Sequence, residues 1–406
     1  MNIFDEISEL LRVVKVGPNP KDGTGYQGHL RTLDGKNLYF SGQDIITFET
    51  ISEKIWKGNN DLFETVTLKA VKDQIIKLLQ KQVFDGNHIT QAETDQFIPT
   101  LISMPIQAWE VFRPLYGANL PPNANPLALG PFTIYHAEHH KANILAKYPH
   151  GNMIYDLELE HMDTMLIMNV MINARENNRA NELSDNKFRQ FDNIIRYMLG
   201  PTHQHDVAVN NFNSWAVTQS LIFSAEQAAS SSSATGSIQS VQITDQFFQD
   251  SKNGNLWIWN KLNSGKLTDL EKRIFAAVNW IGKGAKEKEP ANSFVQYIFA
   301  LESLFTFQKK GVLVSPSIAN QLSEFTAFIL GNDLDSRKRY LKTVKDLYGK
   351  RSAVAHGGSQ VILKDEVVEA YEIVKNLVVT LITQPDLQIL KSVDELQQWV
   401  DNKKYS

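Results

Sequence analysis

The segment from Leu347 to Gly358 contains the residue types that most directly suggest chemistry. It reads Leu-Tyr-Gly-Lys-Arg-Ser-Ala-Val-Ala-His-Gly-Gly, which places Arg351 five positions before His356 and ends on two glycines. An arginine stays charged at physiological pH, and its planar fork matches a phosphate. A histidine changes its charge near neutral pH and can accept or donate a proton. Together the two side chains are the minimum equipment for cleaving an RNA phosphodiester without a metal ion.

A helix expected over residues 334–356 must position this pair. Its apolar stripe comprises Tyr340, Leu341, Val344, Leu347 and Tyr348. Arg351 follows Leu347 by four residues and Tyr348 by three, so a guanidinium occupies the next inward-facing position. Burying that charge costs several kcal/mol unless a phosphate or a carboxylate compensates for it.

The spacing between the two side chains bears on how a site would be assembled. His356 lies about 140° around a continuous helix from Arg351, because each residue turns the helix by roughly 100°. The two side chains of one protomer therefore cannot share a face if the helix continues. Either the helix ends before His356, as Gly357 and Gly358 suggest, or a symmetric second copy completes the site. The geometry favours a dimer.

A second helix, expected over residues 291–308, brings a carboxylate towards the arginine. Its buried stripe is defined by Phe294, Ile298, Leu301 and Phe305, and Glu302 follows Ile298 by four residues. Glu302 is expected to pair with Arg351 or to orient His356. The alternative is an ion pair between Glu302 and a lysine at the edge of the bundle.

The outer side of the helix over 334–356 is basic. Its basic residues are Arg337, Lys338, Arg339, Lys342, Lys345, Lys350 and Arg351, and the nearby acids are Asp333, Asp335 and Asp346. A cationic strip that leads to a histidine suits a polyanion backbone, so Lys342, Lys345 and Lys350 are the expected RNA contacts. The alternative is an ordinary solvated helix face.

The run Ala300-Leu-Glu-Ser-Leu-Phe305, the helix over 334–350 and the segment from Leu347 to Gly358 resemble the Apea-like branch of the HEPN domains. HEPN ribonucleases carry an arginine, a short spacer and a histidine at a helix end, which Arg351 and His356 match with four residues between them. The resemblance covers roughly residues 250–390. Many members carry asparagine or aspartate directly after the arginine, where this chain has Ser352.

The resemblance implies a five-helix bundle that dimerises to form a composite, metal-independent endoribonuclease site without a cofactor. His356 would move a proton at the ribose 2′-hydroxyl or the leaving oxygen, and Arg351 would stabilise charge on the phosphate. Glu302, Ser352 and Tyr348 are expected to support them. Attack by the 2′-hydroxyl would leave a 2′,3′-cyclic phosphate end and a 5′-hydroxyl end. Relatives often act as toxins in phage defence or abortive infection. The alternative is a non-catalytic HEPN module that dimerises and binds RNA or protein, with a ligand-binding N-terminal domain.

Length and composition agree with a globular protein. The 406 residues predict two or three domains, and a formal net charge of −4 excludes a chain coated in basic residues but allows a local basic groove. The absence of cysteine excludes disulfides, zinc ribbons, cysteine nucleophiles and the zinc site of nucleobase deaminases. No signal peptide and no apolar run of roughly 20 residues is present, so a cytoplasmic protein without a membrane partner is expected.

We expect a mixed α/β domain over residues 1–243, with a sensing or restraining role, followed by an all-α bundle over 244–406. The expected N-terminal helices are 4–14, 62–82 and 180–198, with a hairpin over 30–40 that turns at Asp34-Gly35. The expected strands are 105–113, 131–137, 153–160, 164–173, 214–224 and 237–243. The serine-rich tract over 228–236 is expected to be a flexible loop.

The expected C-terminal helices are 244–251, 254–262, 267–283, 291–308, 316–330, 334–356, 363–384 and 391–403. Thr268 and Ser315 occupy expected N-cap positions, and Pro290 and Pro316 are expected to open helices.

Four further groups of residues are set aside. His136, His139, His140, His150 and His161 cluster in sequence, but they do not form a His-Glu-x-x-His motif, so loop histidines are favoured over a metal site. Asp156, Glu158 and Glu160 would share one side of a strand and are interpreted as a solvated face, and His203 and His205 as a turn. Trp257, Trp259 and Trp280 lie among apolar helical residues and are interpreted as core.

Overall fold

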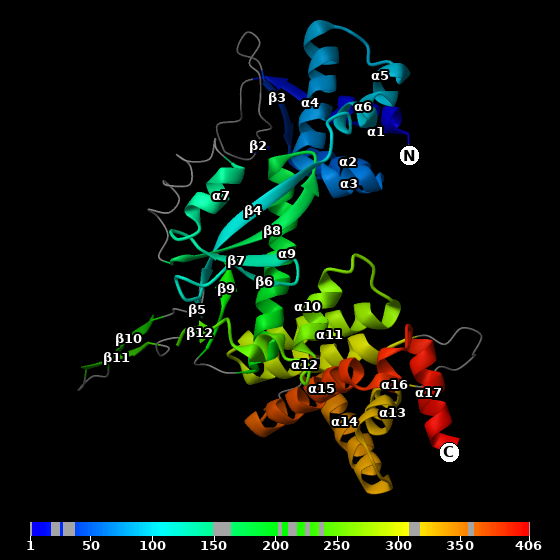
Figure 1. Cartoon of the computed structure of the whole chain (residues 1–406). Coiled ribbons are helices and arrows are strands. Elements are labelled where there is room, and N and C mark those ends of the chain that lie inside the picture. Colours follow the sequence, from blue (N-terminus) through cyan, green and yellow to red (C-terminus); the bar gives the residue numbers. More distant parts are fainter. Residues whose placement is uncertain are drawn as a thin grey trace. The chain divides into compact units, whose positions relative to one another are not determined.

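A computed structural model describes residues 2–17, 25–26, 37–148, 164–201, 205–209, 217–223, 228–234, 239–307, 317–355 and 361–405 (Figure 1). The chain divides into two compact units, one formed by Met1–Val111 with Met171–Asn186 and one by Phe112–Val170 with Lys187–Ser406. Helices and strands alternate up to Gln242, and from Gln246 onward the elements of the described residues are helical. An α and β part thus precedes a helical part, as the sequence predicts.

The first unit contains a helical cluster with a small sheet. Its elements are α1 (Ile3–Val13), β1 (Lys15–Gly17), β2 (Gly25–Tyr26), β3 (Asn37–Ser41), α2 (Gln43–Lys57), α3 (Asn60–Thr65), α4 (Leu68–Asp85), α5 (Gln91–Asp95) and α6 (Phe97–Leu101). The sheet order is β1-β3-β2. The Asp34-Gly35 turn of the expected hairpin lies outside the described residues, and the rest of its second strand falls in β3.

The single helix expected over residues 62–82 is wrong, because two helices meet there. The backbone of Val66 is extended at the end of α3, and its carbonyl accepts a hydrogen bond from Trp56 Nε1 at 2.8 Å. The Thr67 side chain then caps α4 by accepting a hydrogen bond from the Ala70 N–H at 3.1 Å. The threonine cap therefore starts a new helix inside a continuous apolar pattern.

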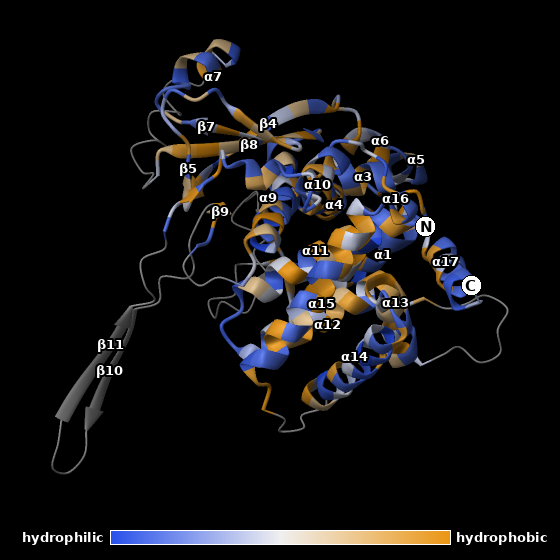
Figure 2. Ribbon diagram, turned by 60° about the horizontal axis from the view of Figure 1, so that its bottom comes forward, coloured by the Kyte–Doolittle hydropathy of each residue, from blue (hydrophilic) through white to orange (hydrophobic). Residues whose placement is uncertain are grey.

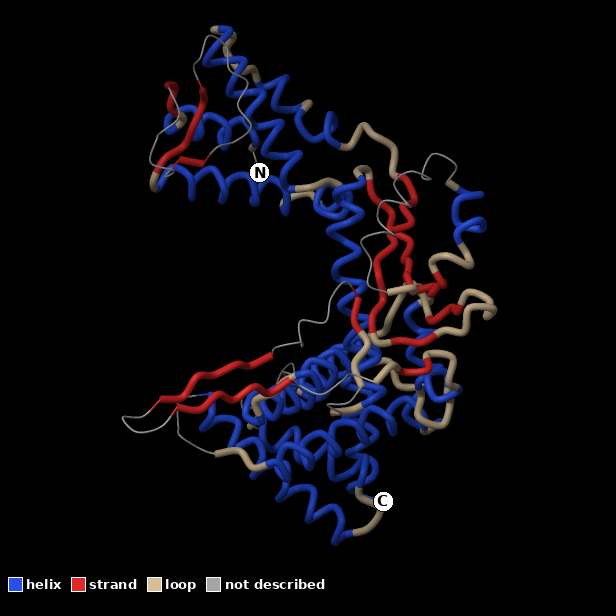
Figure 3. The backbone as a smooth tube through the Cα atoms, turned by 90° about the vertical axis from the view of Figure 1, so that its left-hand side faces the viewer, coloured by secondary structure: helices blue, strands red, loops and turns tan. Residues whose placement is uncertain are grey.

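A sheet with the strand order β6-β7-β8-β4-β9 underlies the middle of the chain (Figure 3). Its strands are β4 (Gln107–Tyr116), β6 (Leu127–Leu129), β7 (Phe132–His136), β8 (Leu166–Ala174) and β9 (Ala208–Val209). The helix α9 (Asn177–Leu199) packs on it through Phe191, whose ring centroid lies 5.1 Å from that of Phe132. The helix α7 (Lys141–Lys147) contributes Ile144 to a separate apolar cluster with Ile167. The strand expected over 153–160 lies outside the described residues.

The flexible loop expected at the serine-rich tract is also wrong. Residues Ala228–Ala234 form β11, which pairs antiparallel with β10 (Val217–Phe223) from Val217 opposite Ala234 to Phe223 opposite Ala228. Alanine and serine have little strand propensity of their own, so cross-strand hydrogen bonding decides the conformation here. Downstream, β12 (Val241–Gln242) pairs in parallel with β5 (Ala118–Asn119).

The helical part follows the expected order closely (Figure 1). Its elements are the 3₁₀ helix η2 (Gln246–Gln249), α10 (Asn255–Leu262), α11 (Asp269–Lys286), α12 (Pro290–Phe305), α13 (Ile318–Leu330), α14 (Leu334–Ala355), α15 (Lys364–Thr383), α16 (Pro385–Gln388) and α17 (Val393–Tyr405). Thr268 caps α11 through a capping box with Glu271, and Pro290 opens α12. Ser317 caps α13, whereas Ser315 and Pro316 lie outside the described residues. Figure 2 shows hydrophobic stretches along α11, α12 and α15.

The C-terminal half of α9 packs against the helical part within the second unit. The Phe191 and Trp259 ring centroids lie 5.9 Å apart, and Lys375 Nζ donates to the Tyr197 carbonyl at 2.8 Å. A Cβ at Gly282 would lie 2.1 Å from the Asn193 carbonyl oxygen, so α11 approaches α9 as closely as only glycine permits. The second compact unit therefore spans residue 243, where the sequence predicts a boundary between two domains.

Candidate functional site

Arg351 lies in the last turn of α14, and its guanidinium faces α12. Val344 and Leu347 are buried on the same helix, which fixes the rotation that turns Arg351 inward. Its Nη2 atom lies 3.4 Å from Glu302 Oε1, so the expected contact between these two side chains forms. The pair brings together two residues 49 positions apart.

The ion pair leaves the guanidinium open. Its 3.4 Å separation exceeds the roughly 2.7–2.9 Å of a strong charge-assisted hydrogen bond. The side chains of Arg351 and Glu302 keep 20% and 21% of their surface exposed. The buried Nε atom of Arg351 has no hydrogen-bond partner among the residues that the structure describes. A planar fork that keeps a fifth of its side chain exposed is suited to receive the oxygens of a second anion.

Aromatic rings complete the surroundings of the guanidinium. Its central carbon lies 4.9 Å from the Phe299 ring centroid and 6.0 Å from that of Tyr348. Both distances are within the range in which a ring face attracts a cation. These rings restrict the guanidinium without using its hydrogen-bond donors.

Burial shapes the acid–base properties of the neighbouring groups. It raises the pKa of Glu302, and the positive charge of Arg351 partly offsets that rise. Burial and the Glu302 charge raise the pKa of Tyr348, again against the influence of Arg351. A phosphate placed on Arg351 would repel the carboxylate and raise the pKa of Glu302 further. The protonation of Glu302 would therefore respond to an anion bound at Arg351.

The expected proton-transfer residue, His356, lies outside the described residues. The described helix ends at Ala355, one residue before it. Ser352 is half-buried in the last turn of α14, and no side-chain hydrogen bond joins it to another described residue. The structure thus brings Glu302, Tyr348 and Arg351 together near the end of α14. His356 is the next residue in the sequence after that helix.

The three expected RNA-binding lysines differ in their environments. Lys342 and Lys345 are exposed on α14, and neither forms an ion pair within the described ranges. Lys350 instead pairs with Glu366 in the first turn of α15. The Glu366 carboxylate also accepts a hydrogen bond from the Leu363 N–H at 3.0 Å. Two lysines are accordingly free for a polyanion, and the third links two helices.

Two aromatic residues near the arginine are absent from the sequence-based site. Phe299 precedes Glu302 by three positions on α12, which is the only sequence signal that relates it to the site. Trp280 contacts Phe299 with ring centroids 5.1 Å apart. The interpretation as core is correct for Trp259, which is 2% exposed, but Trp280 and Trp257 are only half-buried.

The histidines near β7 are engaged by the backbone. His140 Nδ1 lies 2.9 Å from the His136 backbone nitrogen, and its Nε2 lies 3.1 Å from the Ala124 carbonyl oxygen. Burial lowers the pKa of His136, and the neighbouring His139 lowers it further. Across the part of the chain that the structure describes, no group of three or more His, Cys, Asp or Glu residues could hold a metal ion.

Several residues set aside by the sequence lie outside the described ranges. They are His150, His161, His203, Asp156, Glu158 and Glu160. The described residue of the short histidine pair, His205, places its Nδ1 atom 3.2 Å from the Gln239 carbonyl oxygen. A loop contact to the backbone is in keeping with its interpretation as part of a turn.

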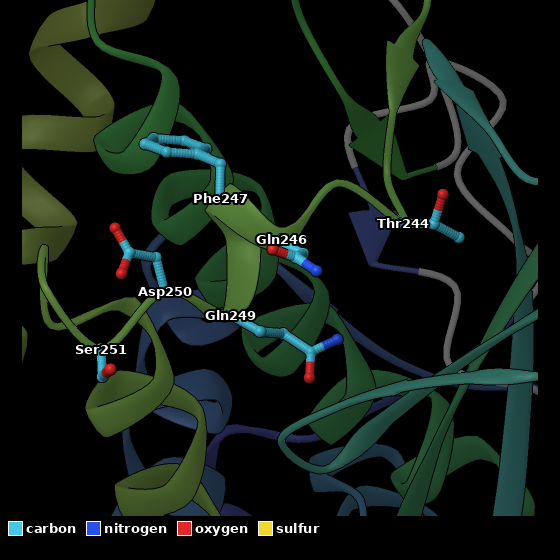
Figure 4. A pocket seen from close by; sticks show the side chains of 6 residues that line it. All are labelled: Thr244, Gln246, Phe247, Gln249, Asp250 and Ser251. Carbon is cyan, nitrogen blue, oxygen red and sulfur yellow. The ribbon is translucent and has the colours of Figure 1, made fainter.

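An open pocket lies at η2 and its flanks (Figure 4). It is lined by Thr244, Gln246, Phe247, Gln249, Asp250 and Ser251. The Asp250 carboxylate already accepts hydrogen bonds from the Lys252 N–H at 2.7 Å and from the Asn253 side chain at 2.5 Å. In Figure 4 the side chains of Phe247 and Gln249 point in different directions, so the pocket does not gather reactive groups.

Comparison with protein-family models, with curated proteins and with solved structures finds no match for this chain. Among the residues that the structure describes, no helix combines the length and the apolar character that crossing a bilayer requires.

Proposed function

We propose that this chain is a metal-independent endoribonuclease of HEPN type that cleaves RNA at a site composed by two copies. The observation that carries the proposal is the state of Arg351. It is a guanidinium whose side chain is 20% exposed and whose ion pair with Glu302 is long, at 3.4 Å, and it lies at a helix end five residues before a histidine. Its availability to an anion distinguishes it from an arginine that only stabilises a fold.

In this mechanism Arg351 binds the non-bridging oxygens of the scissile phosphate and stabilises the charge that develops there. The ribose 2′-hydroxyl attacks phosphorus, and the bond to the 5′-oxygen breaks. His356 transfers a proton, either from the attacking hydroxyl or to the leaving oxygen. The products are a 2′,3′-cyclic phosphate and a 5′-hydroxyl. Tyr348 and Ser352 lie on the same helix face as candidates for orienting the substrate.

Exposed apolar residues beside the site support a contact with a second copy of the chain. Val361 is 82% exposed, and Leu363 and Val368, at the start of α15, are 59% and 52% exposed. The ion pair between Lys350 and Glu366 ties this segment to the end of α14, next to Arg351. Apolar residues exposed this strongly within eight positions of each other suit a contact with another protein surface. A two-fold axis through this surface would bring two copies of the site together.

Cleavage without metal and its dependence on the histidine test the proposal. Purified protein in EDTA should cut RNA, and His356→Ala should abolish cutting while the fold and the dimer persist. The matched control is His88→Ala, which removes an exposed histidine of the first unit and should leave cleavage unchanged. Loss of cutting in EDTA, or equal cutting by the His356 variant, would contradict the mechanism.

One observation favours a second candidate function. Arg351 already has a carboxylate and an aromatic neighbour from α12, as a structural pair would. The bundle would then be a non-catalytic dimerisation module that binds RNA or protein. It predicts that wild type and His356→Ala are equally inert towards RNA and equally harmless when expressed. A role in antiviral defence, with the N-terminal part sensing a trigger, rests on the family resemblance.

A further inference from the structure

Two aromatic rings lie between two cations across three helices, with Lys283 at one end and Arg351 at the other. Lys283 Nζ lies 4.2 Å from the Trp280 ring centroid on α11. The Trp280 ring lies 5.1 Å from Phe299 on α12, and Phe299 lies 4.9 Å from the Arg351 guanidinium on α14. We call Lys283, Trp280 and Phe299 the aromatic row. It connects an exposed lysine to the proposed phosphate site by direct contacts.

The aromatic row lies at the protein surface. The buried face of α11 is formed by Leu270, Ile274, Phe275, Ala277, Val278 and Ile281, and Trp280 is not part of it. Trp280 and Phe299 are half-buried, and Lys283 is exposed. Trp259, by contrast, is buried and donates its Nε1–H to the Phe248 carbonyl at 2.8 Å. Large rings left partly open between two cations are typical of a recognition surface.

We infer that the aromatic row is a stacking platform for unpaired bases of single-stranded RNA that flank the phosphate held by Arg351. The inference rests on the proposed function and names its substrate class. A single strand offers unstacked base faces between its phosphates, and these match two aromatic rings that lie between two cations. In a duplex the ring faces are stacked inside the helix and cannot reach Trp280. The exposed Lys283 has a flexible stem that can move from the indole to a phosphate.

Binding of an uncleavable strand tests the platform separately from catalysis. The probe is a single-stranded 2′-O-methyl oligonucleotide, which lacks the nucleophilic hydroxyl, and fluorescence anisotropy reports its affinity. Trp280→Leu should weaken binding by roughly 5- to 150-fold, the range that loss of one base–aromatic stack produces. The matched control is Trp257→Leu. Trp257 is also half-buried, with Phe275 at 6.1 Å and Lys261 at 5.7 Å, but it lies on α10 and should not affect binding.

A second variant protects the test against misfolding. Lys283→Gln changes an exposed side chain and should weaken binding by roughly two- to fivefold at low salt and less at high salt. A duplex of the same sequence should compete poorly with the single strand. The platform is excluded if folded Trp280→Leu and Lys283→Gln both bind as wild type does, or if the duplex competes equally well.

The outcomes separate the platform from the nuclease. If wild type cleaves RNA in a manner that requires His356, and the Trp280 variant binds normally, the platform alone is wrong. If the uncleavable strand binds through Trp280 and no RNA is ever cut, the nuclease is wrong and the surface is a single-strand binding site.

Discussion

Two arginines of the second unit meet carboxylates in different ways. Arg196 on α9 contacts Asp206 through two atoms, with Nε 2.8 Å from Oδ1 and Nη2 3.3 Å from Oδ2, and its side chain is 9% exposed. Arg351 reaches Glu302 at 3.4 Å, is twice as exposed, and within the described ranges its Nε has no hydrogen-bond partner. The first geometry is a closed fork-to-fork pair, and the second is an open one.

The difference extends to the surrounding charges. The charges of Arg196 and Asp206 act on both Asp192 and Lys286, so these four residues form a cluster at α9 with charges of both signs. For Arg351, the carboxylate that it contacts is Glu302, whose own charge is opposed by burial. A closed network of charges stabilises a fold, whereas a partly exposed arginine at a helix end can bind an anion. This contrast is the physical basis for assigning function to one arginine and structure to the other.

Alanine at each arginine gives the sharpest test of the comparison. Arg351→Ala should lower RNA cleavage by roughly 10²- to 10³-fold, because a donor to the developing phosphate charge is lost. Its unfolding free energy should change by about 1 kcal/mol or less, since the ion pair is partly exposed. Arg196→Ala should lose about 3 kcal/mol of stability, because Asp206 is left unpaired. Denaturant unfolding measures the stability of each variant, and cleavage assays measure its activity. An equal loss of unfolding free energy in the two variants would remove the distinction between a functional and a structural arginine.

The pH dependence of stability tests whether the charges of the cluster at α9 compensate one another inside the fold. Burial raises the pKa of Asp192 from 3.8 to about 7, although Arg196 lowers it. The folded state then keeps a proton that the unfolded state releases, so wild type loses stability as pH rises from about 4 to 7. Asp192→Asn lacks this loss and should exceed wild type by about 2–4 kcal/mol at pH 8, with little difference at pH 4.

The control for that experiment is Asp206→Asn, which weakens the pair with Arg196. It should destabilise the protein at pH 8, opposite in sign to Asp192→Asn. If both asparagine variants are destabilised equally at pH 8, the carboxyl of Asp192 is an ordinary ion-pair partner, and its pKa is not raised by burial.

Glu302→Gln tests whether Arg351 is open to an external anion. Removing the carboxylate charge should tighten binding of an uncleavable RNA about two- to fivefold, because Glu302 no longer competes for the guanidinium. Turnover should fall about tenfold, since the guanidinium loses a group that orients it. Separate KM and kcat measurements distinguish the two effects. Weaker binding instead would mean that Glu302 contacts the substrate directly.

Glutamine at two lysines should give the smallest effects. Lys345 is exposed without a described ion pair, so Lys345→Gln should weaken RNA binding about twofold and reduce its salt dependence. Lys350 is paired with Glu366, so Lys350→Gln should change stability by up to about 1 kcal/mol. Salt titrations of binding, together with thermal unfolding, compare them. Identical salt slopes for the two variants would argue that both lysines serve the same role.

Local signals predict the helical part well because the sequence marks where individual helices begin. Thr268 with Glu271 and Pro290 are start signals, and the stripes on α12 and α14 are continuous enough to place Glu302 opposite Arg351. The rotation of each helix follows from which positions are apolar. Hence the pairing of these two side chains could be predicted from a sequence in which they are far apart.

Features that depend on partners far along the chain could not be predicted in this way. The strand Ala228–Ala234 is specified by its pairing with β10, and its own residues resemble a linker. The break at Thr67 lies within an uninterrupted apolar pattern, which hides the cap. Trp280 is a large aromatic residue among apolar neighbours, as a core residue would be. Only the packing of α11 leaves it at the surface. Periodicity reports which face is apolar but not how completely another element covers it.

The chemical ends of the cleaved RNA test the central claim most directly. Wild-type protein incubated with single-stranded RNA in EDTA should produce a 2′,3′-cyclic phosphate on one fragment and a 5′-hydroxyl on the other. Arg351→Ala and His356→Ala should both lose these ends, and Trp257→Leu should retain them. Fragments that carry a 3′-hydroxyl and a 5′-phosphate, or cleavage that appears only with added metal, would contradict attack by the 2′-hydroxyl at Arg351 and His356.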